Sequence, residues 1–228
     1  MKSNHMRELH FPHAGGCLRT AAVSVFTMVL WPVFGSNLPI YSTDAGNLPG
    51  GTPDPYWSVT GANFGPQPAL VISGSNLYPS WTPDSAASGW IGVLDSVGEP
   101  PSPYTFSETF SLAGYQVSTA QISGNWYADD YLQLFINGVP LSPPLDGGPS
   151  PYWGYPIPFS VPDADLNAGL NTITAVMQQS DQLWDGVRVE FDTATADALG
   201  VPDATSTALL LGMASATLAA GRRMFRRA

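Results

Sequence analysis

Residues 124–141 read GNWYADDYLQLFINGVPL, and this stretch decides the fold that we expect. Every second residue of Tyr131–Ile136 is leucine or isoleucine, which is the period of a strand that packs on a core through one face. Asn137 and Gly138 follow at once, and both tolerate the positive φ that a type I′ hairpin turn requires. Aromatic rings and carboxylates crowd the segment just before the strand. The stretch therefore predicts a rigid hairpin with a polar, aromatic loop at its base, which is typical of a binding sandwich rather than of a catalytic centre.

The composition favours one medium-sized domain of short strands and turns. The 228 residues include 23 glycines and 22 prolines, and only 11% of the residues are charged. The hydrophobic fraction of 44% is sufficient for a real core, so global disorder is not expected.

Basic residues, histidines and the one cysteine are confined almost entirely to the two ends of the chain. Between residues 20 and 221 the only basic residue is Arg188, and this segment has neither histidine nor cysteine. The composition excludes His-based triads, thiol nucleophiles, Schiff-base lysines and His or Cys zinc sites from the domain. A basic footprint is missing too, so we expect no nucleic-acid partner. Carboxylates, hydroxyls, amides and aromatic rings remain for function.

The N-terminus, residues 1–36, has the pattern of a secretory signal peptide. A basic region precedes the apolar run Ala21–Phe34, and small residues favour cleavage near Gly35 or Ser36. The alternative is a retained membrane anchor. It is less favoured because the apolar run is shorter than the ~20 residues that a membrane span prefers.

The C-terminus, residues 199–228, combines a short motif, an apolar run and a basic tail. The motif is Val201, Pro202 and Asp203, and the apolar run is Ala208–Ala220. Four arginines follow the run: Arg222, Arg223, Arg226 and Arg227. An ordinary amphipathic helix is not favoured, because the run carries no charged face. The run predicts a marginal transmembrane helix whose arginines stay on the cytoplasmic side.

This arrangement resembles the PEP-CTERM class of bacterial sorting signals, most closely its VPDSG variant. The chain departs from that pattern at Ala204 and Thr205, where Ser-Gly or Pro-Ser is usual. The resemblance implies recognition by an exosortase, a membrane protease-transpeptidase. It also implies secretion across the inner membrane and delivery to the cell envelope, the cell surface or the exterior.

The middle of the chain, residues 37–198, predicts an all-β domain in which turn-rich segments separate short strands. The strand candidates are Tyr56–Thr60, Ala69–Ile72, Gly89–Leu94, Tyr104–Leu112, Val117–Trp126, Tyr131–Ile136, Ile157–Ser160, Leu170–Gln178 and Gly186–Asp192. Glu108 interrupts the apolar face of one candidate, so we expect it at a rim, a bulge or a paired site.

The order of these segments resembles the galactose-binding-domain-like jelly rolls. The segments that carry the resemblance are DPYWSVTG, TFSLAG, GNWYADDYLQLFING, GLNTITAVM and DGVRVEF, within Tyr41 to Asp192. It implies a jelly-roll-type antiparallel β-sandwich of about eight or nine strands, whose loops bind glycans in related domains. The signal helix and the C-terminal hydrophobic helix would flank it. Fold alone does not establish function.

Aromatic and acidic residues in or beside predicted loops are the candidates for ligand binding. They are Trp81, Trp90, Trp126, Tyr127, Asp129, Asp130, Trp153 and Trp184. The alternative is that the rings fill the ends of the sandwich. Neighbouring residues of a strand point to opposite faces, so Asp129 and Asp130 are expected to be solvated turn or cap carboxylates rather than a glycosidase pair.

Calcium is the one cofactor that the acidic composition leaves open. No Asp-x-Asp-x-Asp loop occurs, but resemblance to related sandwiches implies a possible structural Ca²⁺ site at Asp44, Asp54 or Glu190. The alternative is that the acidic residues keep an exported protein soluble.

Together these features predict an exported, non-enzymatic protein of the bacterial surface or extracellular matrix. The first hypothesis is a carbohydrate-binding or adhesive module whose partners are an exosortase-type membrane protease and an extracellular polysaccharide. The second is a structural matrix or biofilm component without a discrete ligand. The third is a carboxylate-dependent glycoside hydrolase.

Replacing Pro202 and Asp203 by alanine should leave full-length protein in the inner membrane of a host that has an exosortase. The run Ala208–Ala220 gives ~20 Å of helix, short of a ~30 Å hydrocarbon core, so the anchor should be transient. The motif lies just before this helix, where a membrane protease can reach it. Mass spectrometry of the wild-type surface fraction checks the prediction, and an intact Arg226-Arg227-Ala228 terminus there would contradict it.

Overall fold

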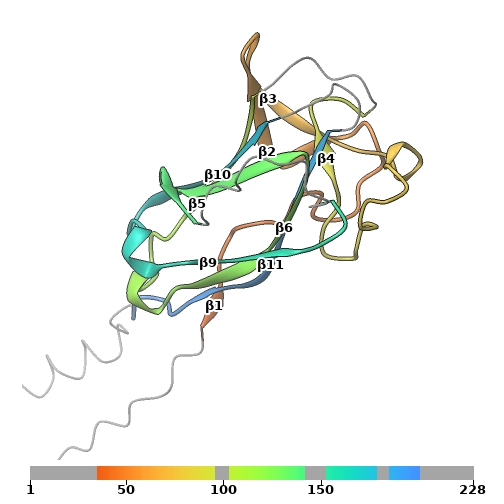
Figure 1. Cartoon of the computed structure of the whole chain (residues 1–228). Helices are drawn as coiled ribbons and strands as arrows, with labels where there is room; N and C mark the ends of the chain where they lie inside the picture. The colour runs from red at the N-terminus through yellow and green to blue at the C-terminus, as the bar shows by residue number, and fades with distance from the viewer. Residues whose placement is uncertain (1–34, 96–102, 142–152, 179–184, 201–228) are drawn as a thin grey trace, which may run out of the picture. The chain divides into compact units, whose positions relative to one another are not determined.

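The computed structural model describes residues 35–95, 103–141, 153–178 and 185–200, which form an all-β domain (Figure 1). Residues 1–34 of the predicted signal peptide, the predicted sorting tail from Val201 onward and Trp184 lie outside the described residues. Within the described ranges, no helix is long and apolar enough to span a membrane.

Short strands make up nearly all of the regular structure, with three short 3-10 helices between them. The strands are β1 (Ser36–Asn37), β2 (Pro53–Gly61), β3 (Phe64–Val71), β4 (Ile91–Gly92), β5 (Tyr104–Ser111), β6 (Gln121–Asp129), β7 (Tyr131–Ile136), β8 (Val139–Pro140), β9 (Ile157–Val161), β10 (Leu170–Gln178) and β11 (Gly186–Ala196). The 3-10 helices are Gly74–Asn76, Val117–Thr119 and Asp163–Asp165.

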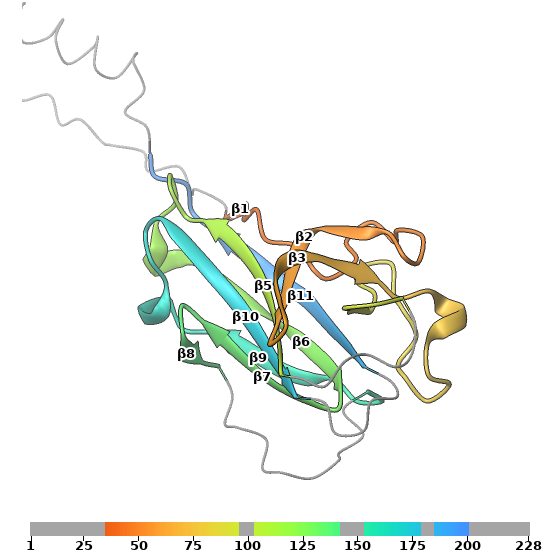
Figure 2. The same ribbon diagram turned by 90° about the horizontal axis from the view of Figure 1, so that it is seen from above.

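The strands pair antiparallel in one sheet that folds over on itself. Its order is β8-β7-β10-β5-β2-β3-β4-β11-β6-β9, and β1 pairs with β11. Figure 1 shows β5 and β10 on one side of the domain and β6, β9 and β11 on the other, and Figure 2 shows the two sides overlapping when seen from above. Buried side chains from both sides, such as Phe106 and Leu134 from one and Trp126 and Val189 from the other, form a single core. The predicted all-β, sandwich-like fold is therefore confirmed.

The predicted hairpin is confirmed in detail. Leu132, Leu134 and Ile136 of β7 are buried, and the residues between them are only half-buried. Asn137 and Gly138 have φ of 50° and 83°, which are the positive values that a type I′ turn requires. The chain then returns as β8, which pairs with β7.

The loop predicted at the base of this hairpin is a strand instead. β6 pairs with β11 on one side and with β9 on the other, so it is an interior strand of the sheet. Trp126 and Ala128 are fully buried there. The start of β6 at Gln121 is later than predicted, because Val117–Thr119 forms a 3-10 helix. No polar binding rim forms at this place.

Leu134→Ala should lower the free energy of unfolding by about 2–4 kcal/mol, because the buried side chain leaves a cavity in a close-packed core. Leu170→Ala is the matched control, since Leu170 lies on the adjacent strand β10 with 70% of its surface exposed. Denaturant unfolding of both variants measures the difference. A loss below about 0.5 kcal/mol for Leu134→Ala would mean that Phe135 faces the core instead.

Candidate functional site

Most of the aromatic residues predicted to bind a ligand are buried. Trp81, Trp90 and Tyr127 form a small apolar cluster, and Trp153 packs against it while half-buried. The rings of Trp81 and Trp90 stack with their centroids 4.2 Å apart. Trp126 is fully buried in the main core. These rings fill the interior, as the alternative interpretation predicts, and the fully buried ones offer no face to a sugar.

The expectation of solvated carboxylates at Asp129 and Asp130 is wrong. Each side chain is only 6% exposed. Asp129 is the last residue of β6, and its Oδ2 accepts a hydrogen bond of 2.7 Å from Nε1 of Trp81. The carboxylate therefore anchors the small aromatic cluster to the sheet.

Arg188 of β11 is buried and holds the long loop between β3 and β4. Its guanidinium donates to Ser88 Oγ at 2.8 Å, to the Pro83 carbonyl at 2.6 Å and to Glu190 Oε2 at 2.7 Å. Its Cζ also lies 4.9 Å from the centroid of the Tyr127 ring. The one basic residue between residues 20 and 221 is thus engaged inside the protein and faces no ligand.

The three residues predicted for calcium have other partners in the structure. The Asp54 oxygens accept backbone hydrogen bonds from Asp44, Tyr56 and Trp57. Glu190 forms an ion pair with Arg188, so its carboxylate is already engaged. Within the part of the chain that the structure describes, no three His, Cys, Asp or Glu residues are grouped closely enough to hold a metal. Calcium binding stays a prediction.

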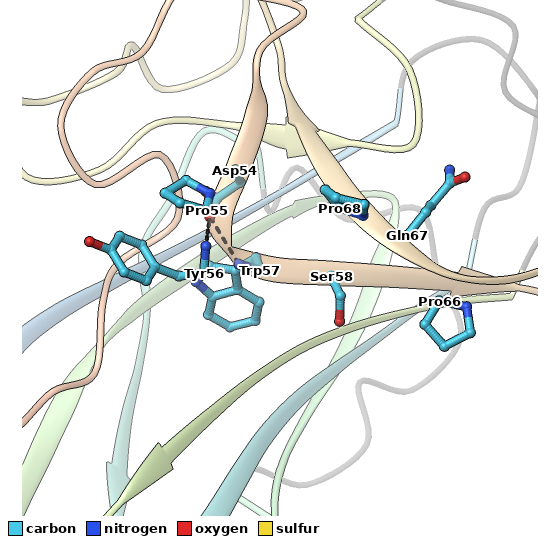
Figure 3. A pocket seen from close by; sticks show the side chains of 8 residues that line it. All are labelled: Asp54, Pro55, Tyr56, Trp57, Ser58, Pro66, Gln67 and Pro68. Atoms are coloured by element: carbon cyan, nitrogen blue, oxygen red, sulfur yellow. Dashed lines mark hydrogen bonds between the residues drawn. The ribbon is translucent and has the colours of Figure 1, made fainter.

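A shallow hollow with an exposed aromatic border lies on the outer surface of the β2–β3 hairpin (Figure 3). Its volume is about 270 Å³, and it is lined by Asp54, Pro55, Tyr56, Trp57, Ser58, Pro66, Gln67 and Pro68. The Tyr56 ring stacks on the ring of Tyr41, with centroids 3.7 Å apart and planes 11° apart. The two tyrosines are 39% and 38% exposed. We call them the tyrosine pair.

The core holds the tyrosine pair in place through its backbone. Trp57 points inward and is almost fully buried, and its Nε1 donates to the carbonyl of Tyr41 at 3.0 Å. The Tyr41 N–H donates to Glu108 Oε1 at 2.9 Å. The Tyr56 N–H donates to Asp54 Oδ1 at 2.8 Å. The aromatic surface is therefore preorganised, which limits the entropy that ligand binding must overcome.

Polar groups of the hollow add directional contacts to this aromatic surface. Gln67 is exposed, and its amide has no hydrogen-bond partner among the described residues. A free amide both donates and accepts, which matches the hydroxyls of a sugar. Pro66 and Pro68 flank Gln67 and give the β3 wall a stiff backbone. Stacking faces combined with a free amide suit the binding of a polar, uncharged ring.

The tyrosine pair has no signature in the sequence. Tyr41 and Tyr56 are 15 positions apart, and no sequence period connects them. The available signal was the pattern of Tyr56 followed by Trp57, because neighbouring residues of a strand face opposite sides. That rule places one of the two rings on the outer surface, but it does not predict the stacking partner.

Glu108 lies beneath the tyrosine pair and is 3% exposed. Its Oε1 accepts the Tyr41 N–H, and its Oε2 has no hydrogen-bond partner among the described residues. Burial raises the pKa of the Glu108 carboxyl to about 9. The hydrogen bond from the Tyr41 N–H opposes this rise, and the charge of Asp54 adds to it. The structure therefore keeps the carboxyl neutral inside the domain, which the sequence pattern did not predict.

Comparisons of the chain with models of protein families, with curated proteins and with solved structures gave no match.

Glu108→Gln should make the protein more stable than the wild type at alkaline pH. The folded state keeps the Glu108 proton up to about pH 9, whereas the unfolded chain releases it near pH 4.5. Wild-type stability should therefore fall by about 1.4 kcal/mol per pH unit between these values from this group alone. Glutamine keeps the acceptor for Tyr41 and removes this loss.

Chemical denaturation between about pH 5 and pH 8.5 measures the effect. Asp163→Asn is the control, because Asp163 is an exposed acid on a separate surface helix and its profile should run parallel to that of the wild type. Parallel profiles for Glu108→Gln and the wild type would show that the buried carboxyl is already ionised.

Proposed function

We propose that this chain is an exported protein of the bacterial surface or extracellular matrix, and that its sandwich is a non-catalytic module that binds carbohydrate or serves in adhesion. An exosortase-type membrane protease would process the C-terminal motif after the hydrophobic helix has held the chain in the membrane. The sandwich would have the jelly-roll connectivity that the sequence resemblance implies. Its partner would be an extracellular polysaccharide.

The observation that carries this proposal is the exposed tyrosine pair beside the hollow. Sugar rings present flat faces of C–H groups that pack on aromatic rings, and Tyr41 and Tyr56 offer such rings in a fixed position. The shallow shape of the hollow suits a polymer that lies across a surface. Gln67, at the end of the hollow away from Tyr56, supplies an amide for hydroxyl groups (Figure 3). Binding of this kind needs no catalytic group.

A structural matrix protein without a discrete ligand is the second candidate. One specific observation favours it: Trp90 and Trp126, which were candidates for ligand binding, are fully buried. Under this alternative, the tyrosine pair would be a surface feature without a binding partner.

Tyr56→Ala should weaken binding to any glycan that the wild type recognises by about tenfold. The loss of an aromatic contact worth about 1.4 kcal/mol corresponds to one decade in affinity. A glycan array followed by titration calorimetry of the full-length chain in mild detergent gives the measurement. Tyr155→Ala is the matched control, because Tyr155 is 65% exposed and does not line the hollow.

Two outcomes would count against the proposal. If no glycan binds the wild type, the structural alternative is supported. If a glycan binds and Tyr56→Ala keeps wild-type affinity, a carbohydrate site exists elsewhere and the hollow is not it.

A further inference from the structure

The described lining of the hollow holds one carboxylate, that of Asp54, and no basic side chain. Residues 38–200 contain 16 Asp and Glu residues and a single basic residue, Arg188. Arg188 is buried and engaged with Glu190, so it does not reach the hollow. Among the described residues, a ligand at the tyrosine pair would therefore find no cation with which to form an ion pair.

The carboxylate of Asp54 lies in the wall of the hollow, but backbone hydrogen bonds already occupy its oxygens. Its Oδ1 accepts the N–H groups of Tyr56 and Trp57, and its Oδ2 accepts that of Asp44. Three backbone bonds leave little capacity for a ligand hydroxyl, but the negative charge remains. An acidic group entering the hollow would meet this charge at short range.

We propose that the hollow selects uncharged glycans over acidic ones. The inference rests on the proposed function and names the class of its ligand. Gln67 is the exposed side chain of the hollow that can both donate to and accept from a hydroxyl. A uronic acid offers a carboxylate that can only accept, and the site provides no charge to balance it.

Paired probes test the proposal. Cello-, galacto- and manno-oligosaccharides are titrated into the full-length chain, each as the neutral sugar and after oxidation of its primary alcohols to carboxylates. We expect the oxidised form to bind at least about fivefold more weakly than its neutral parent, because like charges repel. Raising the salt concentration should reduce this difference without changing the affinity for the neutral form.

Gln67→Lys should reverse the preference by placing a cation in the hollow. It should improve binding of the oxidised sugar by at least about fivefold. Gln121→Lys is the matched control, because Gln121 is exposed on β6, outside the hollow. This substitution adds the same net charge to the protein. The control should leave the preference for neutral sugar in place, which separates a local effect from an effect of net charge.

The outcomes distinguish the two proposals. Equal or tighter binding of oxidised sugars by the wild type, with loss of binding in Tyr56→Ala, overturns the selectivity and leaves the proposed function standing. Absence of binding to both members of every pair, together with an empty glycan array, overturns the proposed function and the selectivity with it. An unchanged preference in Gln67→Lys overturns the location of the selectivity at the hollow.

Discussion

Burial of apolar side chains between the two halves of the sheet is the interaction on which the rest of this structure depends. The chain has no cysteine after Cys17, so no disulfide can stabilise the domain. Trp126 from one half and Leu134 from the other are fully buried in the same cluster. Burial of each such side chain contributes about 1.5–3 kcal/mol. Summed over the core, this gain is similar in size to the conformational entropy that the chain loses on folding. The surface depends on this core as well, because Trp57 points into it while bonding to the backbone of Tyr41.

The two edge strands of the sheet, β8 and β9, limit association of the domain with other chains through strand pairing. β8 ends at Pro140 and β9 contains Pro158, so each edge carries a residue without a backbone N–H. Proline on an edge strand hinders the addition of another strand from a second chain. This sheet therefore favours contacts through side chains on the outer surface of the β2–β3 hairpin over the addition of strands to its edges.

Local patterns predicted the strands well, because the alternation of residues decides which face is buried. β7 and β10 have the predicted bounds, and the Asn137-Gly138 turn is confirmed. The candidate site could not be predicted in the same way. A ring in a loop has no period, so the sequence does not tell whether Trp81 is covered by other groups. The stacking of Tyr41 on Tyr56 depends on a contact between segments that fold together only in three dimensions.

The position of Arg188, the one basic residue among the described residues, links the stability of the domain to its proposed mode of recognition. Arg188 binds Ser88, the carbonyl of Pro83 and Glu190, so its charge stabilises the loop between β3 and β4. A guanidinium engaged in this way is lost as an anion-binding group, and the outer surface keeps an excess of carboxylates. That excess favours solubility, and it leaves stacking and amide hydrogen bonds as the means of recognition in the proposed site. Contacts of this kind depend little on ionic strength, whereas an ion-paired site on the same surface would weaken as salt rises.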